Sequence, residues 1–163
     1  MRTELFQYKD GTKDLEILSG KAFQSSADSD VTEWFSFKEM KTAIETQRGI
    51  CVKAVSGEGN LLGFVYSQQE SPINGKEGLE KWVIIIMAVD PNMTGQGVGT
   101  LLLKEIEKQA IDKGALKMFV YTNKGDDKVV SFYQKNGYSD AGWVKDYQYG
   151  SNNSAVFLLK YLS

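Results

Sequence analysis

The chain has 163 residues, of which 42% are hydrophobic and 12% aromatic, and this is enough to bury the core of one ordinary domain but not of two. The 19 lysine and arginine residues and 21 aspartate and glutamate residues leave a net charge of −2 at pH 7. No basic cluster could follow a phosphate backbone, so we expect no nucleic-acid partner. We predict a single domain over residues 1–163.

The sequence contains no histidine, and this excludes several kinds of catalytic site. Serine–histidine–aspartate triads, cysteine–histidine pairs and the common zinc sites all need an imidazole, so we expect neither those hydrolases nor a bound metal. Cys51 is the one cysteine, and its place in a short apolar alternation favours a buried residue over a nucleophile. Proton transfer would then depend on carboxylate, tyrosine, lysine, cysteine or water.

Neither the N-terminus nor any internal segment predicts a membrane protein. Residues 1–10 mix charges and lack the apolar core of a signal segment, and the longest apolar run, Trp82–Val89, is too short to cross a bilayer. We therefore expect a cytoplasmic protein with no membrane partner. The sequence leaves open whether the chain forms a homodimer.

The N-terminal part of the chain predicts two helices. Apolar residues at helical spacing indicate a first helix over Leu15–Ala22, and the short polar residues of 25–30 indicate a loop. A second apolar stripe over Trp34–Ile44 predicts another helix that faces the core, with Asp30 or Thr32 as its N-cap.

The middle of the chain predicts strands. Alternating residues over Gly49–Val55 and Leu61–Gln68 flank the turn sequence SGEGN and indicate an antiparallel hairpin. Residues 70–78 contain proline, glycine and mixed charges and indicate an exposed connection. Trp82–Val89 is continuously apolar and β-branched, which predicts a strand that is buried on both faces.

The last third of the chain alternates helices and strands. We predict a helix over 98–110, a strand over 116–122, a helix over 126–136, and two strands over 138–149 and 155–162. Because strand, helix and strand follow one another with short links between residues 82 and 122, we expect one parallel crossover in a sheet that is otherwise antiparallel.

Three glycines stand where the buried strand turns into the helix, in the stretch AVDPNMTGQGVGTLLL that begins at Ala88. A helix start has N–H groups without partners and a partial positive charge, so an anion binds well there. The spacing matches neither the dinucleotide fingerprint nor the Walker pattern. The remaining interpretations are a pyrophosphate held by main-chain amides, and a plain turn that uses glycine for tight packing.

Two segments resemble the GNAT superfamily of N-acetyltransferases. AVDPNMTGQGVGTLLL resembles the acyl-CoA binding segment of that family, and DDKVVSFYQKNGY resembles a later helix motif. Together they cover about residues 82–138. The resemblance implies a mixed α/β (α+β) fold with a mostly antiparallel central sheet, one parallel strand–helix–strand crossover and helices on both faces. It also implies acetyl-CoA as the cosubstrate.

The resemblance implies a set of residues that bind coenzyme A. The turn from Gly95 to Thr100 would hold the pyrophosphate through its amides, and the backbone of β-strand residues Met87 and Val89 would pair with the pantetheine arm. The full set is Met87, Ala88, Val89, Thr94, Gly95, Gln96, Gly97, Val98, Gly99, Thr100, Asn123, Asp126, Lys128 and Tyr133.

Several of these positions depart from the family pattern. Thr94 stands where the family has arginine or glutamine, so a side-chain anchor for the phosphates is lost or weakened. Lys128 is a candidate replacement for that cation. Asp126 replaces an asparagine and can cap the helix but cannot donate a hydrogen bond to the pantetheine, for which Asn123 is a substitute. Val129 stands in place of the usual alanine.

The resemblance implies direct attack by an amine on the thioester, without a covalent enzyme intermediate. Tyr133 matches the tyrosine that protonates the departing sulfur, although an aromatic residue on the inner face of a helix is the structural alternative. Where some members carry a glutamate as the base, this sequence has Val83. Glu80 is a candidate base, and a solvated carboxylate at the strand end is the alternative.

The acceptor would be recognised by the parts that do not match the motifs. Trp143, Tyr147 and Tyr149 could enclose an amine or could be cross-strand packing on the terminal hairpin. We predict an N-acetyltransferase that moves an acetyl group from acetyl-CoA to a primary amine of a small molecule or peptide. The alternatives are an acyl-CoA-binding module with little or no activity and an unrelated nucleotide-binding protein.

Overall fold

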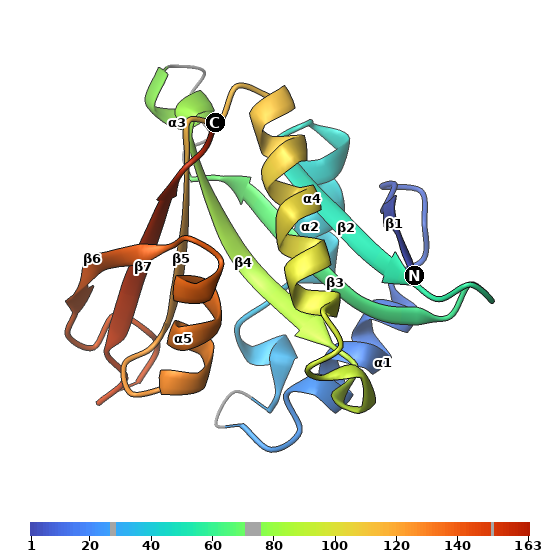
Figure 1. Ribbon diagram of the computed structural model, residues 1–163, viewed down its shortest axis with the longest axis horizontal. Coiled ribbons are helices and arrows are strands. Elements are labelled where there is room, and N and C mark those ends of the chain that lie inside the picture. The colour runs from blue at the N-terminus through green and yellow to red at the C-terminus, as the bar shows by residue number, and fades with distance from the viewer. Residues whose placement is uncertain (27–28, 71–75, 151) are drawn as a thin grey trace.

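The computed structural model describes residues 1–26, 29–70, 76–150 and 152–163, and its framework is a sheet of seven strands (Figure 1). The order across the sheet is β1-β2-β3-β4-β5-β7-β6, and every neighbouring pair is antiparallel except β4 and β5. The strands are β1 (Arg2–Leu5), β2 (Gly49–Val55), β3 (Leu61–Gln69), β4 (Lys81–Val89), β5 (Lys117–Asn123), β6 (Ser139–Val144) and β7 (Ala155–Tyr161).

The helices cover both faces of this sheet (Figure 1). They are α1 (Lys13–Ala22), η1 (Val31–Glu33), α2 (Phe37–Glu45), α3 (Lys76–Glu80), η2 (Pro91–Met93), α4 (Val98–Asp112) and α5 (Asp127–Lys135). The mixed, mostly antiparallel sheet with one parallel crossover, β4-α4-β5, is therefore confirmed. Within the described ranges, no helix is both long and apolar enough to cross a membrane.

Each face of the sheet has its own core. The face under α4 and α5 buries a cluster that includes Trp82, Leu102 and Met118, and the face under α1 and α2 buries another that includes Leu15, Met40 and Phe64. Trp82 is fully buried, and β4 contributes residues to both clusters. The prediction that the Trp82–Val89 segment is a strand buried on both faces is confirmed.

The structure corrects the predicted start of the second helix. α2 begins at Phe37, because the Ser36 side chain accepts a hydrogen bond from the Glu39 amide at 3.2 Å and so caps the helix. Asp30 caps the preceding short helix η1 instead, by accepting from the Thr32 amide at 3.1 Å. Trp34 follows η1 and lies outside α2.

Other boundaries also differ from the predictions. The edge strand β1 has four residues, too few for a periodic signal, and was not predicted. The strand predicted over 138–149 ends at Val144, and the following residues form turns and bends. The predicted connection over 70–78 contains the start of α3, while 71–75, like 27–28 of the predicted loop over 25–30, lie outside the described residues.

Four buried groups keep their protons at alkaline pH in the folded chain. Burial raises the pKa of the Cys51 thiol above its ordinary value of 9.0, and it raises the pKa of Tyr66, Tyr133 and Tyr138 above their ordinary value of 10.0. For Tyr138, the hydrogen bond to the neighbouring Glu107 carboxylate adds to this rise. In the unfolded chain these groups ionise near their ordinary values, so the unfolded state binds fewer protons at high pH.

The free energy of unfolding should therefore be fully retained below about pH 9 and fall as the pH rises further, because each group adds a slope that approaches about 1.4 kcal/mol per pH unit. Urea unfolding followed by circular dichroism over this pH range measures the slope. Cys51→Ala removes the first group to ionise and should reduce the slope, whereas Gly20→Ala on the exposed side of α1 should not. A slope of Cys51→Ala equal to that of the unsubstituted chain would contradict the burial argument.

Candidate active site

The parallel strands β4 and β5 pair over only part of their lengths. Their register runs from Lys81 opposite Lys117 to Ile84 opposite Val120, but β4 continues to Val89 and β5 to Asn123. Figure 1 shows the two strands separating toward these ends. A gap therefore opens in the middle of the sheet, between two strands whose backbone groups are directed toward it.

A bulge in β4 lies at the start of this gap. Ile84 pairs with Ser67 and Ile86 pairs with Tyr66, so Ile85 is an extra residue without a partner of its own on β3. An extra residue inverts the alternation of the side chains. Ile84 therefore lies in the core under α4, while Ile86 lies in the core under α1 and α2.

The bulge also determines which main-chain groups of β4 face the gap. The Asp90 amide donates to the Leu62 carbonyl at 2.9 Å, which continues the register of β3 and β4. In an antiparallel pair, hydrogen bonds to one neighbour involve alternate residues, so Ala88 is directed toward β3. The N–H and C=O groups of Met87 and Val89 are directed to the opposite side, toward the gap.

The glycine turn follows β4 and leads into α4. Gly95 and Gly97 have φ of +79° and +82°, a region that disfavours side chains. Gly97 is the N-cap of α4, and the first intrahelical bond runs from the Leu101 amide to the Gly97 carbonyl at 3.0 Å. The amides of residues 98–100 consequently have no acceptor within the helix, and the helix dipole adds positive charge there.

Position 99 requires a glycine for a different reason, because α5 approaches the helix closely there. A Cβ atom at this position would lie 3.1 Å from Cζ of Phe132 and 3.2 Å from its Cε2. Both distances are shorter than ordinary van der Waals contacts. The third glycine therefore lets α5 pack against the start of α4, while the first two shape the turn.

A cavity of about 1060 Å³ occupies the gap between β4 and β5. It is lined from the strands themselves by 84–87 and 120–123, from α5 by Lys128, Val129 and Tyr133, and from the end of α1 by Ala22 and Phe23. Because α5 and α1 belong to opposite faces of the sheet, the cavity is lined from both faces. Two reactants could therefore reach the same point from opposite sides.

Tyr133 lines the cavity from the α5 side. Its side chain is 4% exposed, and its ring packs against Phe132 and Tyr138 at centroid distances of 5.1 and 5.4 Å. Burial raises its pKa, so the phenol is protonated throughout the neutral range. Tyr133 therefore packs in the core, as the structural alternative predicts, and it also lines the cavity, as the family resemblance implies.

Five aromatic side chains line the cavity on the face of the sheet opposite α4. Phe23 and Trp34 form an edge-to-face pair at 5.4 Å on the α1 side. Val120 packs under α4, and because Tyr121 is the next residue of β5, its side chain points to the other face. There its ring contacts the Tyr147 ring at a centroid distance of 5.2 Å. Tyr149 completes the set.

Tyr149 also joins two distant parts of the chain at this cavity. Its hydroxyl donates to the Glu33 carboxylate at 3.2 Å, across 116 positions of sequence. Tyr147 and Tyr149 are about half exposed. The loop after β6 therefore meets η1 beside the aromatic lining, and a carboxylate lies at that junction.

The structure brings together some of the residues singled out in the sequence but not others. Met87, Asn123, Asp126, Lys128, Tyr133, Tyr147 and Tyr149 line the cavity. Asp126 caps α5 by accepting from the Val129 amide at 3.3 Å, as predicted. Thr94 and Gln96 lie exposed in the turn after β4, and the Ala88 side chain is buried under α1 and α2.

Trp143 and Glu80 do not line the cavity. Trp143 is 54% exposed on β6, with the Lys124 ammonium 3.5 Å from its ring centroid. Glu80 immediately precedes β4, four residues before Ile84, the first residue of this strand to reach the cavity. At about 3.3 Å per residue this separation is about 13 Å along the strand.

Sequence reasoning missed Phe23, Trp34 and Tyr121 as cavity residues. The sequence pattern places Trp34 in a helix stripe that faces the core, and it does not single out the other two. Their common surface arises only when the end of α1, the end of η1 and β5 line one cavity, which no local pattern encodes. The one available signal was the unusual number of aromatic residues that follow the first helix.

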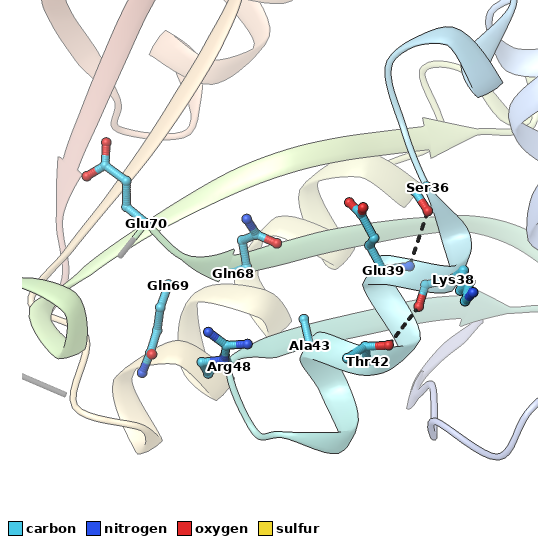
Figure 2. Close-up of a pocket in the computed structure, with 9 residues that line it drawn as sticks. All are labelled: Ser36, Lys38, Glu39, Thr42, Ala43, Arg48, Gln68, Gln69 and Glu70. Atoms are coloured by element: carbon cyan, nitrogen blue, oxygen red, sulfur yellow. Dashed lines mark hydrogen bonds between the residues drawn. The ribbon is translucent and has the colours of Figure 1, made fainter. Parts of the chain in front are cut away.

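A second cavity, of about 490 Å³, lies between α2 and the end of β3 (Figure 2). Its side chains carry both signs of charge, with Lys38 and Arg48 on one hand and Glu39 and Glu70 on the other. The Glu70 carboxylate is bound by the Lys81 ammonium at 2.7 Å. This cavity lies away from the gap between the parallel strands.

The chain belongs to the acetyltransferase (GNAT) family, whose model matches residues 13–138. It is 28% identical over 100 residues to a mycothiol acetyltransferase of Arthrobacter sp. (strain FB24), and the matched region is 61% of this chain and 30% of that protein. The chain thus spans about a third of the length of this relative.

Solved structures share the fold over nearly the whole chain. A ribosomal-protein-alanine N-acetyltransferase from Brucella melitensis has a TM-score of 0.78 at 16% identity, with 99% of this chain and 100% of that chain covered. An aminoglycoside 6′-N-acetyltransferase complexed with coenzyme A has a TM-score of 0.72 at 19% identity, with 99% and 97% covered. At these identities the likeness concerns the fold.

The packing of Gly99 against Phe132 predicts a position-specific cost of adding a side chain. Gly99→Val should lower the free energy of unfolding by about 1–3 kcal/mol, because its methyl groups overpack the contact between α4 and α5. Gly20→Val is the matched control, since this helical glycine has nothing within 4 Å and should change stability by less than about 0.5 kcal/mol. Equal melting temperatures for the two variants would contradict the close approach.

Proposed function

We propose that the chain is an N-acetyltransferase that transfers an acetyl group from acetyl-CoA to a primary amine. The observation that carries this proposal is the gap between β4 and β5, with main-chain groups of Met87 and Val89 directed into it. A pantetheine arm has amide groups of its own and can pair with β4 as an added strand would. This explains why a strand in the middle of the sheet leaves one side unpaired.

The glycine turn then receives the diphosphate of the same molecule. The amides of residues 98–100 lack acceptors within α4, and the turn adjoins the end of β4, so one extended molecule reaches both. Thr94 supplies no positive charge, but Lys128 is exposed and lines the cavity. We assign phosphate binding mainly to main-chain donors, with the Lys128 ammonium as a supplementary charge.

The chemistry at the thioester requires a donor for the carbonyl oxygen and stabilisation of the departing sulfur. As the amine nitrogen bonds to the carbonyl carbon, negative charge develops on the oxygen, and a main-chain N–H of β4 that faces the gap can stabilise it. The C–S bond then breaks, and its electron pair leaves with the sulfur of coenzyme A. No enzyme group needs to be acylated in this sequence.

The position of Tyr133 in the cavity lining supports a role for it at that sulfur. Because its pKa lies above 10.0 and that of a thiol is about 8.5, complete transfer of the phenolic proton to the thiolate is uphill. A hydrogen bond from the Tyr133 hydroxyl stabilises the departing thiolate without this cost, and the sulfur takes its final proton from solvent or the new ammonium. We therefore assign Tyr133 as the hydrogen-bond donor to the leaving group.

The proton of the attacking amine leaves through water in this proposal. Asp126 is the one carboxylate among the described residues that line the cavity, and it accepts from the Val129 amide as a helix cap. Glu80 lies before β4 and would need a water chain to act as the base. The lack of a well-placed base among the described residues is the observation that supports a second candidate function, a module that binds acyl-CoA with little turnover.

Removal of a single main-chain donor tests the phosphate site. Thr100→Pro deletes one amide in the first helical turn, where proline is tolerated, and should weaken coenzyme A binding by at least about tenfold. Thr100→Ala keeps the amide and should bind within about twofold of the unsubstituted chain. Titration calorimetry with coenzyme A measures both variants, and equal affinities would contradict main-chain recognition.

The same titrations with NAD and ATP should show no comparable binding. Tighter binding of either nucleotide would favour an unrelated nucleotide-binding protein.

The assignment of Tyr133 predicts a loss of turnover without a loss of cosubstrate affinity. Tyr133→Phe should lower kcat by at least about tenfold, because a hydrogen bond to a developing charge is lost, while the Kd for coenzyme A changes by less than about twofold. Tyr138→Phe is the control, since this buried tyrosine bonds Glu107 at 3.1 Å outside the cavity and should lower stability but not kcat. Thiol release from acetyl-CoA over a panel of primary amines measures the rates.

Two other outcomes would change the conclusion. Unchanged turnover in Tyr133→Phe would remove this residue from the mechanism. Coenzyme A binding with no turnover of any amine would identify the acyl-CoA-binding module.

A further inference from the structure

The acceptor side of the cavity differs in composition from the carrier side. On the face opposite α4, the lining is dominated by Phe23, Trp34, Tyr121, Tyr147 and Tyr149. On the other face, α5 contributes Tyr133, Val129 and the charged residues near its start. Since the carrier is assigned to the face of α4 and α5, the aromatic residues remain for the second reactant.

We propose that this acceptor is a small monoamine whose body is a flat aromatic ring. The inference rests on the proposed acetyl transfer, and it is carried by the two aromatic pairs that flank the gap. The Phe23–Trp34 pair on the α1 side and the Tyr121–Tyr147 pair on the β5 side are held by edge-to-face contacts at 5.4 and 5.2 Å. Rings held in this way offer fixed flat and edge surfaces to another ring.

A third ring holds the Tyr121–Tyr147 pair in place. Phe157 of β7 pairs with Tyr121 across the sheet and contacts both Tyr121 and Tyr147, with centroid distances of 5.4 and 5.0 Å. The Tyr121 side chain is partly buried, and burial raises the pKa of its phenol. These contacts fix the rings before a substrate arrives, which reduces the entropy lost on binding.

The charges around the cavity distinguish a monoamine from a polycation. Among the described residues that line it, Lys124, Asp126 and Lys128 are charged, which gives two positive charges and one negative. The Glu33 carboxylate adds one negative charge at the junction with Tyr149. A single ammonium can be attracted by Glu33 and by the tyrosine faces, but a substrate with several ammonium groups would find no excess of carboxylates.

Competing acceptors test this inference directly. We would compare 2-phenylethylamine, butylamine, spermidine and kanamycin as acceptors of the acetyl group from acetyl-CoA, with thiol release as the readout. The value of kcat/KM for 2-phenylethylamine should exceed that for butylamine by at least about tenfold, because only the first has a ring to stack. Spermidine and kanamycin should be poorer acceptors than 2-phenylethylamine.

Substitutions in the lining should remove this preference. Trp34→Leu and Tyr121→Leu each keep an apolar side chain but remove a ring, and each should reduce the ratio of kcat/KM for 2-phenylethylamine to that for butylamine by at least about fivefold. Tyr161→Leu is the matched control, because this exposed aromatic residue of β7 lies outside the lining and its loss should leave the ratio unchanged. Because the two lining variants lie on separate elements, the test still stands if one of them misfolds. Thermal melting would detect such misfolding.

The outcomes separate this inference from the proposed function. Acetylation of spermidine or kanamycin in preference to 2-phenylethylamine, or equal rates for butylamine, would overturn the aromatic acceptor while acetyl transfer still stood. If no amine is acetylated, the proposed function fails. Calorimetric titration of the coenzyme A complex with 2-phenylethylamine then decides the inference: saturable binding that Trp34→Leu weakens supports it, and no binding overturns it.

Discussion

Backbone groups inside a sheet must find hydrogen-bond partners, and β4 meets this requirement on only one side beyond Ile84. Its other side faces the gap where β5 has separated, although the surrounding core is dense and mostly apolar. An extended molecule with amide groups of its own is the natural partner for such an edge. The bulge at Ile85 determines which main-chain groups face this edge, the glycine turn follows the edge, and α5 lines the cavity beside it.

A chain without histidine has few ways to catalyse acyl transfer, and the structure is consistent with the least demanding one. In the proposed mechanism, fixed main-chain donors and a phenol kept neutral by burial would stabilise negative charge without having to exchange a proton. The thioester is already activated, so attack by an amine needs orientation and charge stabilisation more than a strong base. Asp126 is the one carboxylate among the described residues that line the cavity, which agrees with a mechanism that needs no strong base. The same shortage of negative charge disfavours an acceptor with several ammonium groups.

Much of the fold could be predicted because its signals are local. The apolar run Trp82–Val89, the helix stripe after the glycine turn and the cap at Asp126 each depend on neighbours within a few residues. Trp34 and Tyr121 could not be predicted as members of the aromatic lining, because they are far apart in sequence and line one cavity only in the folded chain. Glu80 stands before β4 as predicted, but the sequence does not show how far along β4 the cavity begins. A short edge strand such as β1 leaves no periodicity to detect.

The central claim is that the unpaired edge of β4 and the amides at the start of α4 hold one thioester carrier. A crystal structure of the chain with acetyl-CoA tests it most directly. The pantetheine amides should lie within hydrogen-bond distance of the main chain of Met87 and Val89, and the diphosphate should lie on the amides of residues 98–100. Acetyl-CoA bound in the cavity beside α2, or with its pantetheine away from β4, would contradict the account.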